Sequence, residues 1–177
     1  EQQGQSRTRL VSHAIVIMDW IVGGALLDKV HALCLQHDHT GLAQLADQWL
    51  VLLDTMQDAQ MAHGDLAGCN VLVRSNGTLA LIDYDGCYVP PLAGKKSQVS
   101  GQVDYQHPEM ENRPFNERMD SFSGYVIYSA LRALYLRPQL WEKYAPRDHS
   151  GNLIEDRMLF AQKDFQNPDH SQLFAEI

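Results

Sequence analysis

The sequence predicts a mainly α-helical domain of the α+β class, with one short β-hairpin between its helices. Two segments, 41–62 and 120–136, carry apolar residues at three- and four-residue steps, which places those residues on one stripe of a helix. Between these segments, two short apolar runs flank Asn76-Gly77. This pair is typical of a tight hairpin, because both residues tolerate positive φ. The expected framework is therefore a helix, a polar turn, a hairpin, a long loop and a second helix.

The remaining segments predict smaller elements. Residues 1–12 are polar, and we expect them to be irregular or disordered. The apolar run 14–18 predicts a buried strand over 13–18, which Gly23-Gly24 should end, and residues 25–34 predict a short helix. Residues 87–116 are rich in proline, glycine and polar residues and have no period. A loop this long within a compact domain is usually functional.

Composition narrows the class of protein. The 177 residues are 45% hydrophobic and carry a formal net charge of −8, which argues against nucleic acid or an anionic membrane as the main partner. The three cysteines lack CxxC spacing and indicate neither a disulfide framework nor a zinc site. No apolar run approaches the roughly 20 residues of a membrane helix, and the start lacks the layout of a signal peptide. We therefore expect a soluble, cytoplasmic protein.

Three polar residues indicate the chemistry. Asp65 and Asn70 lie on the turn after the first long helix, and the hairpin then returns the chain to Asp83. The ends of a hairpin lie close together, so Asn70 and Asp83 should converge. Amide and carboxylate oxygens suit Mg²⁺, while Asp65 remains free to orient a substrate hydroxyl. This is the layout that phosphoryl transfer requires, because that reaction depends on positioning and charge neutralisation.

The motifs resemble those of protein kinases, in the correct order. His63-Gly64-Asp65-Leu66, followed by Asn70, resembles the family's catalytic loop, and Ile82-Asp83-Tyr84-Asp85 stands where the family has its metal-binding Asp-Phe-Gly. Segment 101–109, which ends in His107-Pro108-Glu109, resembles the end of an activation segment. The helix that opens at Asp120 resembles the family's central helix, and residues 16–24 resemble the strand and hinge that hold adenine. The resemblance covers residues 13 to 136.

The resemblance implies a fold and a division of the chain. The expected fold is the large lobe of a divergent, bacterial Ser/Thr-type protein kinase, with a short catalytic hairpin and a hinge strand. Residues 13–24 would be the end of a small-lobe strand and the hinge, and residues 25–177 the large lobe. Nothing before residue 13 resembles the rest of a small lobe. That lobe or another chain would then cover the surface of the hinge.

The resemblance also implies roles, with ATP and Mg²⁺ as cofactors and a protein as the substrate. Asp65 would orient or deprotonate the acceptor hydroxyl, while Asn70 and Asp83 would hold Mg²⁺. The residues implied around adenine are Met18, Asp19, Ile21 and Leu72. Structural support of the site would come from His63, Asp120 and Glu109. We expect Asp120 to cap its own helix, since a helix N-terminus favours an acidic residue, and to accept hydrogen bonds from backbone amides of the 63–65 turn.

The departures from the family pattern leave alternatives open. Gly64 replaces the arginine that usually pairs with a phosphorylated activation loop, so this chain would not need that phosphate for order. Ala67 replaces a phosphate-contacting lysine, and Asp85 replaces a glycine. These features are also similar to small-molecule kinases of the aminoglycoside and choline kinase type. A pseudokinase scaffold is the third reading, although the complete set of two carboxylates and one amide argues against it.

A second polar cluster offers a metal site as an alternative to a solvated loop. His31, His37 and His39 lie near Cys34 and Asp38 in the sequence. Nothing in their spacing makes four ligands converge. We therefore expect a loop there, without a metal.

Overall fold

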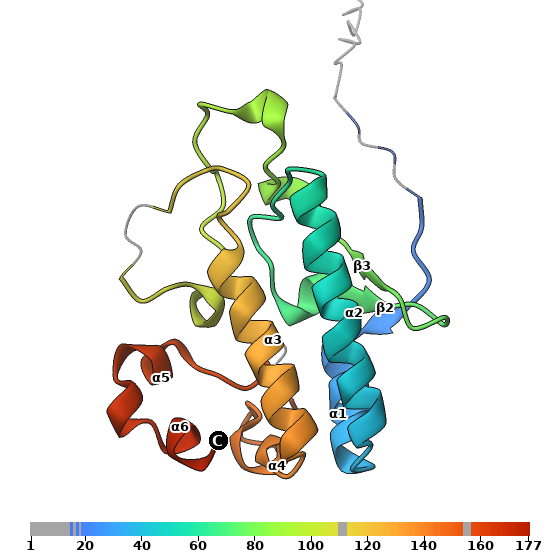
Figure 1. Ribbon diagram of the computed structural model, residues 1–177, viewed down its shortest axis with the longest axis vertical. Coiled ribbons are helices and arrows are strands. Elements are labelled where there is room, and N and C mark those ends of the chain that lie inside the picture. The colour runs from blue at the N-terminus through green and yellow to red at the C-terminus, as the bar shows by residue number, and fades with distance from the viewer. Residues whose placement is uncertain (1–14, 16, 18, 110–112, 154–156) are drawn as a thin grey trace, which may run out of the picture.

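The computed structural model describes residues 15, 17, 19–109, 113–153 and 157–177. In Figure 1 helices are the largest regular elements, long loops connect them, and a small sheet lies beside the first two helices. This architecture agrees with the expected mainly α-helical class. The helices are α1 (Leu26–Leu35), α2 (His39–Asp58), α3 (Ser121–Leu136), α4 (Leu140–Tyr144), α5 (Gln162–Gln166) and α6 (Gln172–Glu176). Short 3₁₀ turns are η1 (Gly68–Asn70), η2 (Tyr84–Gly86), η3 (Pro90–Leu92), η4 (Val103–Tyr105) and η5 (Pro168–His170).

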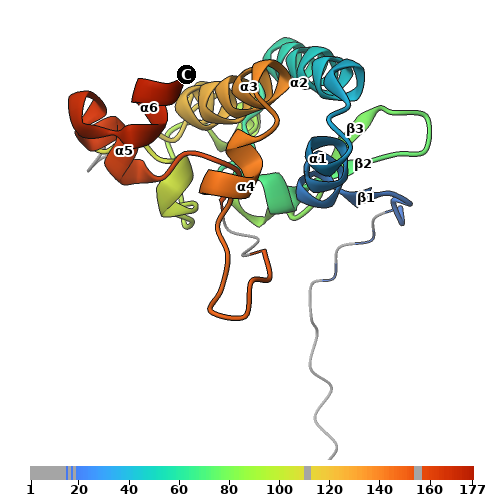
Figure 2. The same ribbon diagram turned by 90° about the horizontal axis from the view of Figure 1, so that it is seen from below.

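The long helices α2 and α3 lie side by side and form the centre of the fold (Figures 1 and 2). Trp49 of α2 is fully buried, and its indole Nε1 donates to the carbonyl oxygen of Gly124 in α3 at 2.9 Å. A Cβ atom at Gly124 would lie 3.1 Å from the side chain of Leu53. The close approach of the two helices therefore depends on a small residue. The predicted apolar stripes face each other here, as their periodicity requires.

The first long helix is shifted relative to the prediction of 41–62. It begins at His39, because the side chain of Asp38 accepts a hydrogen bond from the backbone N–H of Gly41 at 2.9 Å and caps the helix. It ends at Asp58, and Gln60 then takes a φ of +51°. Ala62 pairs instead with Tyr88 in an isolated antiparallel bridge. The last four predicted residues therefore lead the chain towards the polar turn.

The sheet has three antiparallel strands in the order β1 (Gly24–Ala25), β2 (Val71–Val73) and β3 (Leu79–Leu81). The predicted hairpin joins β2 and β3, but with a longer loop than a two-residue turn. Arg74 N–H donates to the Thr78 carbonyl, and Gly77 N–H donates to the Arg74 carbonyl. Gly77 takes a φ of +83°, whereas the side chain of Asn76 accepts from Thr78. This is a type I turn followed by a left-handed glycine.

The prediction of a buried strand over residues 13–18 is wrong for the described residues of that run. Ile15 and Ile17 are 79% and 88% exposed and lie outside any strand, and residues 13, 14, 16 and 18 are outside the described part of the chain. The strand forms later, where Gly24 pairs with Val73. A Cβ atom at Gly23 would lie 2.8 Å from the Val73 carbonyl oxygen, so glycine permits the approach. Hydrogen-bond partners, rather than apolar character, decide where this strand lies.

The second polar cluster serves the packing of the helices. Trp141 Nε1 donates to Nδ1 of His31 at 2.8 Å, and Nδ1 of His39 lies 2.6 Å from the Tyr135 carbonyl oxygen. Within the described residues, no group of three or more His, Cys, Asp or Glu side chains could hold a metal ion. No helix in the described part of the chain is both long and apolar enough to cross a membrane.

Candidate active site

A buried carboxylate, that of Asp120, anchors the backbone of the turn at residues 63–65. Asp120, which is 4% exposed, accepts hydrogen bonds from the backbone N–H groups of His63 and of Gly64, the latter at 3.2 Å. This contact was expected from the sequence. The expectation that the Asp120 side chain also caps its own helix is wrong, since it makes no capping hydrogen bond there. Its two oxygens are instead engaged by the turn and by Arg113.

His63 links the turn to the end of the hairpin. Its ring is fully buried, and Nε2 lies 2.7 Å from the carbonyl oxygen of Ile82. Because a carbonyl can only accept, Nε2 carries the proton. His63 thereby fixes the backbone immediately before Asp83. A buried histidine that makes this hydrogen bond to the backbone has a structural role.

Gly64 allows the turn to pass close to another segment. It takes a φ of +85°, and a Cβ atom there would lie 2.2 Å from the carbonyl oxygen of Gly86. No real side chain fits at that distance. The glycine that replaces the family's arginine is therefore required by the local crossing of the two backbones.

Asp65 and Asn70 share one hydrogen-bonded unit. The Asn70 amide nitrogen Nδ2 donates to the Asp65 carbonyl oxygen at 2.8 Å and to its carboxylate Oδ2 at 3.3 Å. The other carboxylate oxygen of Asp65, Oδ1, accepts from the backbone N–H of Gln102 at 3.0 Å. The carboxylate is therefore oriented from both sides. Asn70 Oδ1 is turned away from Asp65, and the Cys69 thiol lies 3.7 Å from it.

A backbone hydrogen bond brings the segment that carries Asp83 next to Asn70. The N–H of Ile82 donates to the Asn70 carbonyl at 3.0 Å, so the hairpin brings its two ends together. Asp83 is exposed and takes a φ of +63°. This left-handed conformation is uncommon for a residue other than glycine, and such residues cluster at functional sites. The neighbouring Asp85 lies in η2 and is also exposed.

The donor set suits a hard cation. Asn70 and Asp83 offer oxygen atoms, and because Nδ2 of Asn70 donates to Asp65, Oδ1 is the atom of that amide that could coordinate a metal. Mg²⁺ takes few ligands from a protein and completes its shell with water and phosphate. Two oxygen ligands on adjoining backbone segments therefore fit this ion.

Burial raises the pKa of three groups around the turn. The pKa of the Tyr84 hydroxyl and that of the Cys87 thiol are raised by desolvation, as is the pKa of the Tyr105 hydroxyl. Tyr84 donates to the Leu81 carbonyl at 2.9 Å, and the Tyr105 hydroxyl accepts from Gly68 N–H at 3.4 Å. These hydroxyls stay protonated at neutral pH and act as structural hydrogen-bonding groups.

The residues expected around adenine lie at the sheet and before it. Leu72 of β2 is half-buried between Ala25 and Ala80. Ile21 is half-buried and Asp19 is exposed, while Met18 lies outside the described residues. Trp20 is 90% exposed. Trp20, Ile21 and Leu72 therefore leave apolar side chains partly or largely accessible, and their contact with adenine stays a prediction.

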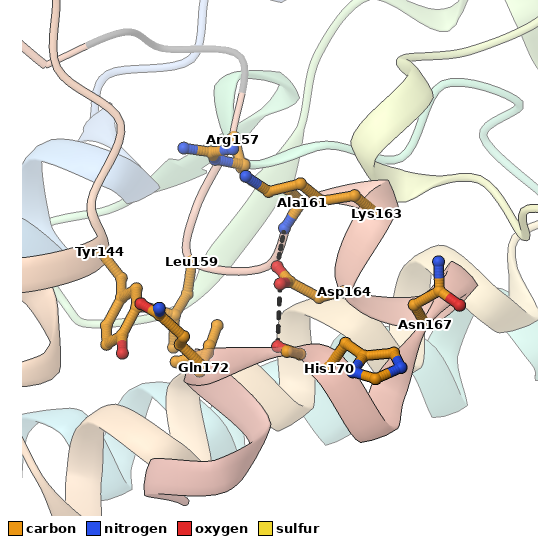
Figure 3. Close-up of a pocket in the computed structure, with 11 residues that line it drawn as sticks. Tyr144, Arg157, Leu159, Ala161, Lys163, Asp164, Asn167, His170 and Gln172 are labelled. Carbon is orange, nitrogen blue, oxygen red and sulfur yellow. Dashed lines mark hydrogen bonds between the residues drawn. The ribbon is translucent and has the colours of Figure 1, made fainter.

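A pocket of about 500 Å³ lies elsewhere, in the C-terminal part of the chain (Figure 3). Its lining comes largely from α5, η5, α6 and the segment before α5, and includes Arg157, Lys163 and His170. None of the residues of the 63–65 turn or of the hairpin lines it. Cavity size therefore does not identify the candidate active site here, whereas the hydrogen-bonded carboxylates and amide do.

Sequence reasoning missed three residues at the site. Arg113 donates to the Gly64 carbonyl and to Asp120, Gln102 bonds Asp65, and Tyr105 lies under η1. The side-chain Oε1 of Gln102 is buried and has no hydrogen-bond partner among the described residues. By contrast, Glu109, predicted as a support of the site, is exposed, and its backbone N–H donates to His107. No sequence signal distinguishes Arg113, because it lies in an aperiodic loop.

The chain is similar to known Ser/Thr protein kinases. It is 27% identical over 136 residues to serine/threonine-protein kinase PAK 1 of Mus musculus, a match that covers 68% of this chain and 25% of that protein. An Aurora kinase of Eremothecium gossypii is 27% identical over 121 residues, covering 66% of this chain and 32% of the relative. Aurora kinase A-A of Xenopus laevis is 30% identical over 122 residues, covering 68% and 30%.

This similarity supports a place in the protein-kinase-like superfamily and a kinase-like transferase. The chain spans about a quarter to a third of the length of these relatives. No protein-family model matches it.

Proposed function

We propose that this chain is the large lobe of a protein kinase that transfers the γ-phosphate of ATP to a hydroxyl of a protein substrate. The observation that carries the proposal is the orientation of the Asp65 carboxylate. Hydrogen bonds from Asn70 and Gln102 fix its two oxygens, and Asp120 anchors the backbone of its turn. The similarity to Ser/Thr protein kinases supports the same reaction class.

In this proposal Asp65 acts on the acceptor hydroxyl. The hydroxyl oxygen forms the new bond to phosphorus, the bond to the bridging oxygen of the nucleotide breaks, and Asp65 accepts the hydroxyl proton. A carboxylate already held on both oxygens keeps free lone pairs for that proton and loses little orientational freedom on binding. The turn therefore serves positioning, which is the main task in phosphoryl transfer.

Asn70 Oδ1 and the Asp83 carboxylate would hold the metal–nucleotide complex. The magnesium ion, when bound, neutralises charge on the phosphates. Asp83 follows Ile82, whose backbone N–H donates to the Asn70 carbonyl oxygen, and this adjoining position in the backbone supports the proposal. On the other side of the hairpin, Leu72 and the backbone of Asp19 and Ile21, with Met18, would contact adenine.

A protein surface would complete the adenine site. Ile17, Trp20 and Val22 are between 78% and 90% exposed, and large apolar side chains exposed within one short segment support an interaction surface there. We assign this surface to a small kinase lobe or to another chain that takes its place.

Substitution of the two aspartates tests the proposal. Asp65→Asn should leave Mg-ATP affinity nearly unchanged and lower kcat, because its role concerns the transferring hydroxyl. Asp83→Asn should weaken Mg-ATP binding as well. Asp54→Asn, an exposed carboxylate on α2, makes the same chemical change away from the site and serves as the control. Both quantities are measured in the complete protein by radiolabelled phosphate transfer and by titration with Mg-ATP.

Three results would speak for the rival functions or against the proposal. Equal loss of nucleotide binding in both variants would contradict the division of roles. Phosphate transfer to a small hydroxyl compound rather than to protein would favour the small-molecule kinase. A third result would favour the scaffold: the unmodified protein transfers no phosphate, and both aspartate variants bind a protein partner as tightly as the unmodified protein does.

A further inference from the structure

Arg113 joins four separate groups around the 63–65 turn. Its Nη1 donates to the carbonyl oxygen of Gly64 at 2.7 Å and to that of Ser100 at 3.3 Å. Its Nη2 donates to Asp120 at 2.6 Å, and its Nε donates to the Met119 carbonyl at 3.0 Å. The Arg113 side chain is only 9% exposed. A nearly buried guanidinium is stable when its charge is paired and its donors are used, and this one meets both conditions.

The same place is a crossing of backbone segments. Gly101 takes a φ of +74°, and a Cβ atom there would lie 3.1 Å from Arg113 Nη1 and 3.2 Å from the Gly64 carbonyl oxygen. A Cβ atom at Gly86 would lie 3.2 Å from the side chain of Val99. Segment 99–102 therefore lies directly against the turn, and one arginine bonds both backbones.

This crossing bears directly on Asp65. Gln102, the residue that follows Gly101, donates its backbone N–H to Asp65 Oδ1. The position of that N–H depends on where segment 99–102 lies. Arg113 is the charged side chain that bonds this segment, through the Ser100 carbonyl, to the turn that carries Asp65.

We propose that Arg113 is a positioning residue that locks segment 99–102 onto the 63–65 turn and so holds the Gln102 N–H on Asp65. Its charge is already balanced by Asp120, and its donors already point at protein acceptors. The lock therefore operates without a phosphate on the segment, and phosphorylation of Ser97 or Ser100 is not a switch for activity. The contact between segment 99–102 and the turn is a property of the fold, while its effect on turnover rests on the proposed kinase function.

Arg113→Met tests the lock, and Arg118→Met is its matched control. Arg118 is an exposed arginine five positions further along the chain, so its loss should change nothing. In Arg113→Met, the amides of residues 99–102 should exchange hydrogen at least tenfold faster, a local opening in the sense of partial unfolding, while α2 and α3 stay protected. We expect kcat to fall about 100-fold, the cost of a misplacement of roughly 1 Å, with Mg-ATP affinity within about twofold.

Arg113→Lys keeps the charge and provides a second variant if the first does not fold. A lysine ammonium cannot span the fork of acceptors that a guanidinium bonds, so exchange and kcat should lie between those of the unmodified protein and Arg113→Met. Treatment of the unmodified protein with a phosphatase should leave kcat unchanged.

The outcomes separate the two proposals. Unchanged exchange at 99–102 in both arginine variants would overturn the lock. Faster exchange with an unchanged kcat would overturn the positioning role of Arg113 towards Asp65, and a loss of activity after phosphatase treatment would overturn its independence from phosphate. An unmodified protein that transfers no phosphate would contradict the proposed function alone, since hydrogen exchange still decides whether Arg113 holds the segment.

Discussion

At the scale of single residues, Asp120 has two structural roles, because it is buried between the turn and Arg113. Asp120 anchors the backbone of the 63–65 turn and also pairs with Arg113. One carboxylate with two oxygens can satisfy these donors because they approach from different segments. A role as the cap of its own helix would compete for the same lone pairs, which explains why that cap is absent.

Removal of the Asp120 carboxylate should be costly. Asp120→Ala leaves the guanidinium of Arg113 without its counter-charge and two backbone N–H groups without an acceptor. We expect a loss of about 3–5 kcal/mol in the free energy of unfolding, and a smaller loss for Asp120→Asn. Urea denaturation measures both. Asp47→Ala, an exposed change on α2, should stay within about 0.5 kcal/mol of the unmodified chain, and a similar value for Asp120→Ala would contradict this account.

Cys34 should make the fold sensitive to alkali. The thiol is 3% exposed, and burial raises its pKa from 9.0 to about 12. The unfolded thiol ionises first, so the stabilising contribution is complete below pH 9 and is lost as pH rises towards 12. By pH 10 the free energy of unfolding should have fallen by about 1.4 kcal/mol through this group.

The slope of stability with pH tests this prediction. Cys34→Ala removes the titrating group, so its free energy of unfolding should fall less steeply between about pH 8 and pH 10. The comparison concerns slopes, because loss of the sulfur also lowers stability at every pH. Parallel curves would show that Cys34 does not titrate differently in the two states.

At the scale of elements, the candidate site lies at the C-terminal end of α2 and the N-terminal end of α3. Figure 1 shows the start of α3 near the end of α2. The 63–65 turn comes shortly after the end of α2, and Asp120 immediately precedes the start of α3. The packing of the two helices therefore sets the distance between the turn and its anchor. Trp49 and Gly124 form a buried hydrogen bond between the helices.

Trp49→Phe should loosen that packing. The change removes the indole donor and part of a fully buried ring, and we expect about 2 kcal/mol of destabilisation. Thermal unfolding followed by circular dichroism gives the value. Leu50→Ala, at a partly exposed neighbouring position, is the control and should cost clearly less. Equal costs would mean that the contact between the helices is not centred on Trp49.

At the scale of the whole molecule, the described residues provide one side of the proposed nucleotide site. Leu72 and Ile21 are half-buried, and Trp20 and Val22 are exposed. An adenine ring placed there keeps one face in water, which forfeits much of the apolar burial that drives binding. Asp65, Asp83 and Asp85 also present negative charge to a polyphosphate.

The 177-residue chain alone should therefore bind Mg-ATP weakly and be a poor catalyst. Isothermal titration of the 177-residue chain measures the affinity, and Asp83→Asn in the same chain shows whether any heat comes from the proposed site. Low-micromolar affinity, or turnover at roughly 1–100 per second, would show that this chain suffices without a covering lobe.

The sequence predicted those parts of the fold that depend on local pattern. The periodicities over 41–62 and 120–136 predicted two helices, with ends wrong by a few residues where Asp38 and Gln60 set the caps. The pair Asn76-Gly77 predicted the hairpin but not its loop length. The prediction of a buried strand over 13–18 is wrong at Ile15 and Ile17, the described residues of that run, because an apolar pattern indicates burial in a core and does not provide a strand partner.

The order of Asp65, Asn70 and Asp83 around the hairpin was enough by itself to suggest the chemistry of phosphoryl transfer, because these residue types and the hairpin are encoded locally, whereas His63 and Asp120 were implied by the resemblance to protein kinases. The tertiary structure alone decided that Arg113 rather than Glu109 reaches the 63–65 turn, and that the Asp120 carboxylate faces that turn rather than its own helix. These contacts join segments far apart in the chain, and they depend on backbone paths that only glycine permits, as at Gly64 and Gly101. Residue type and spacing do not specify such paths.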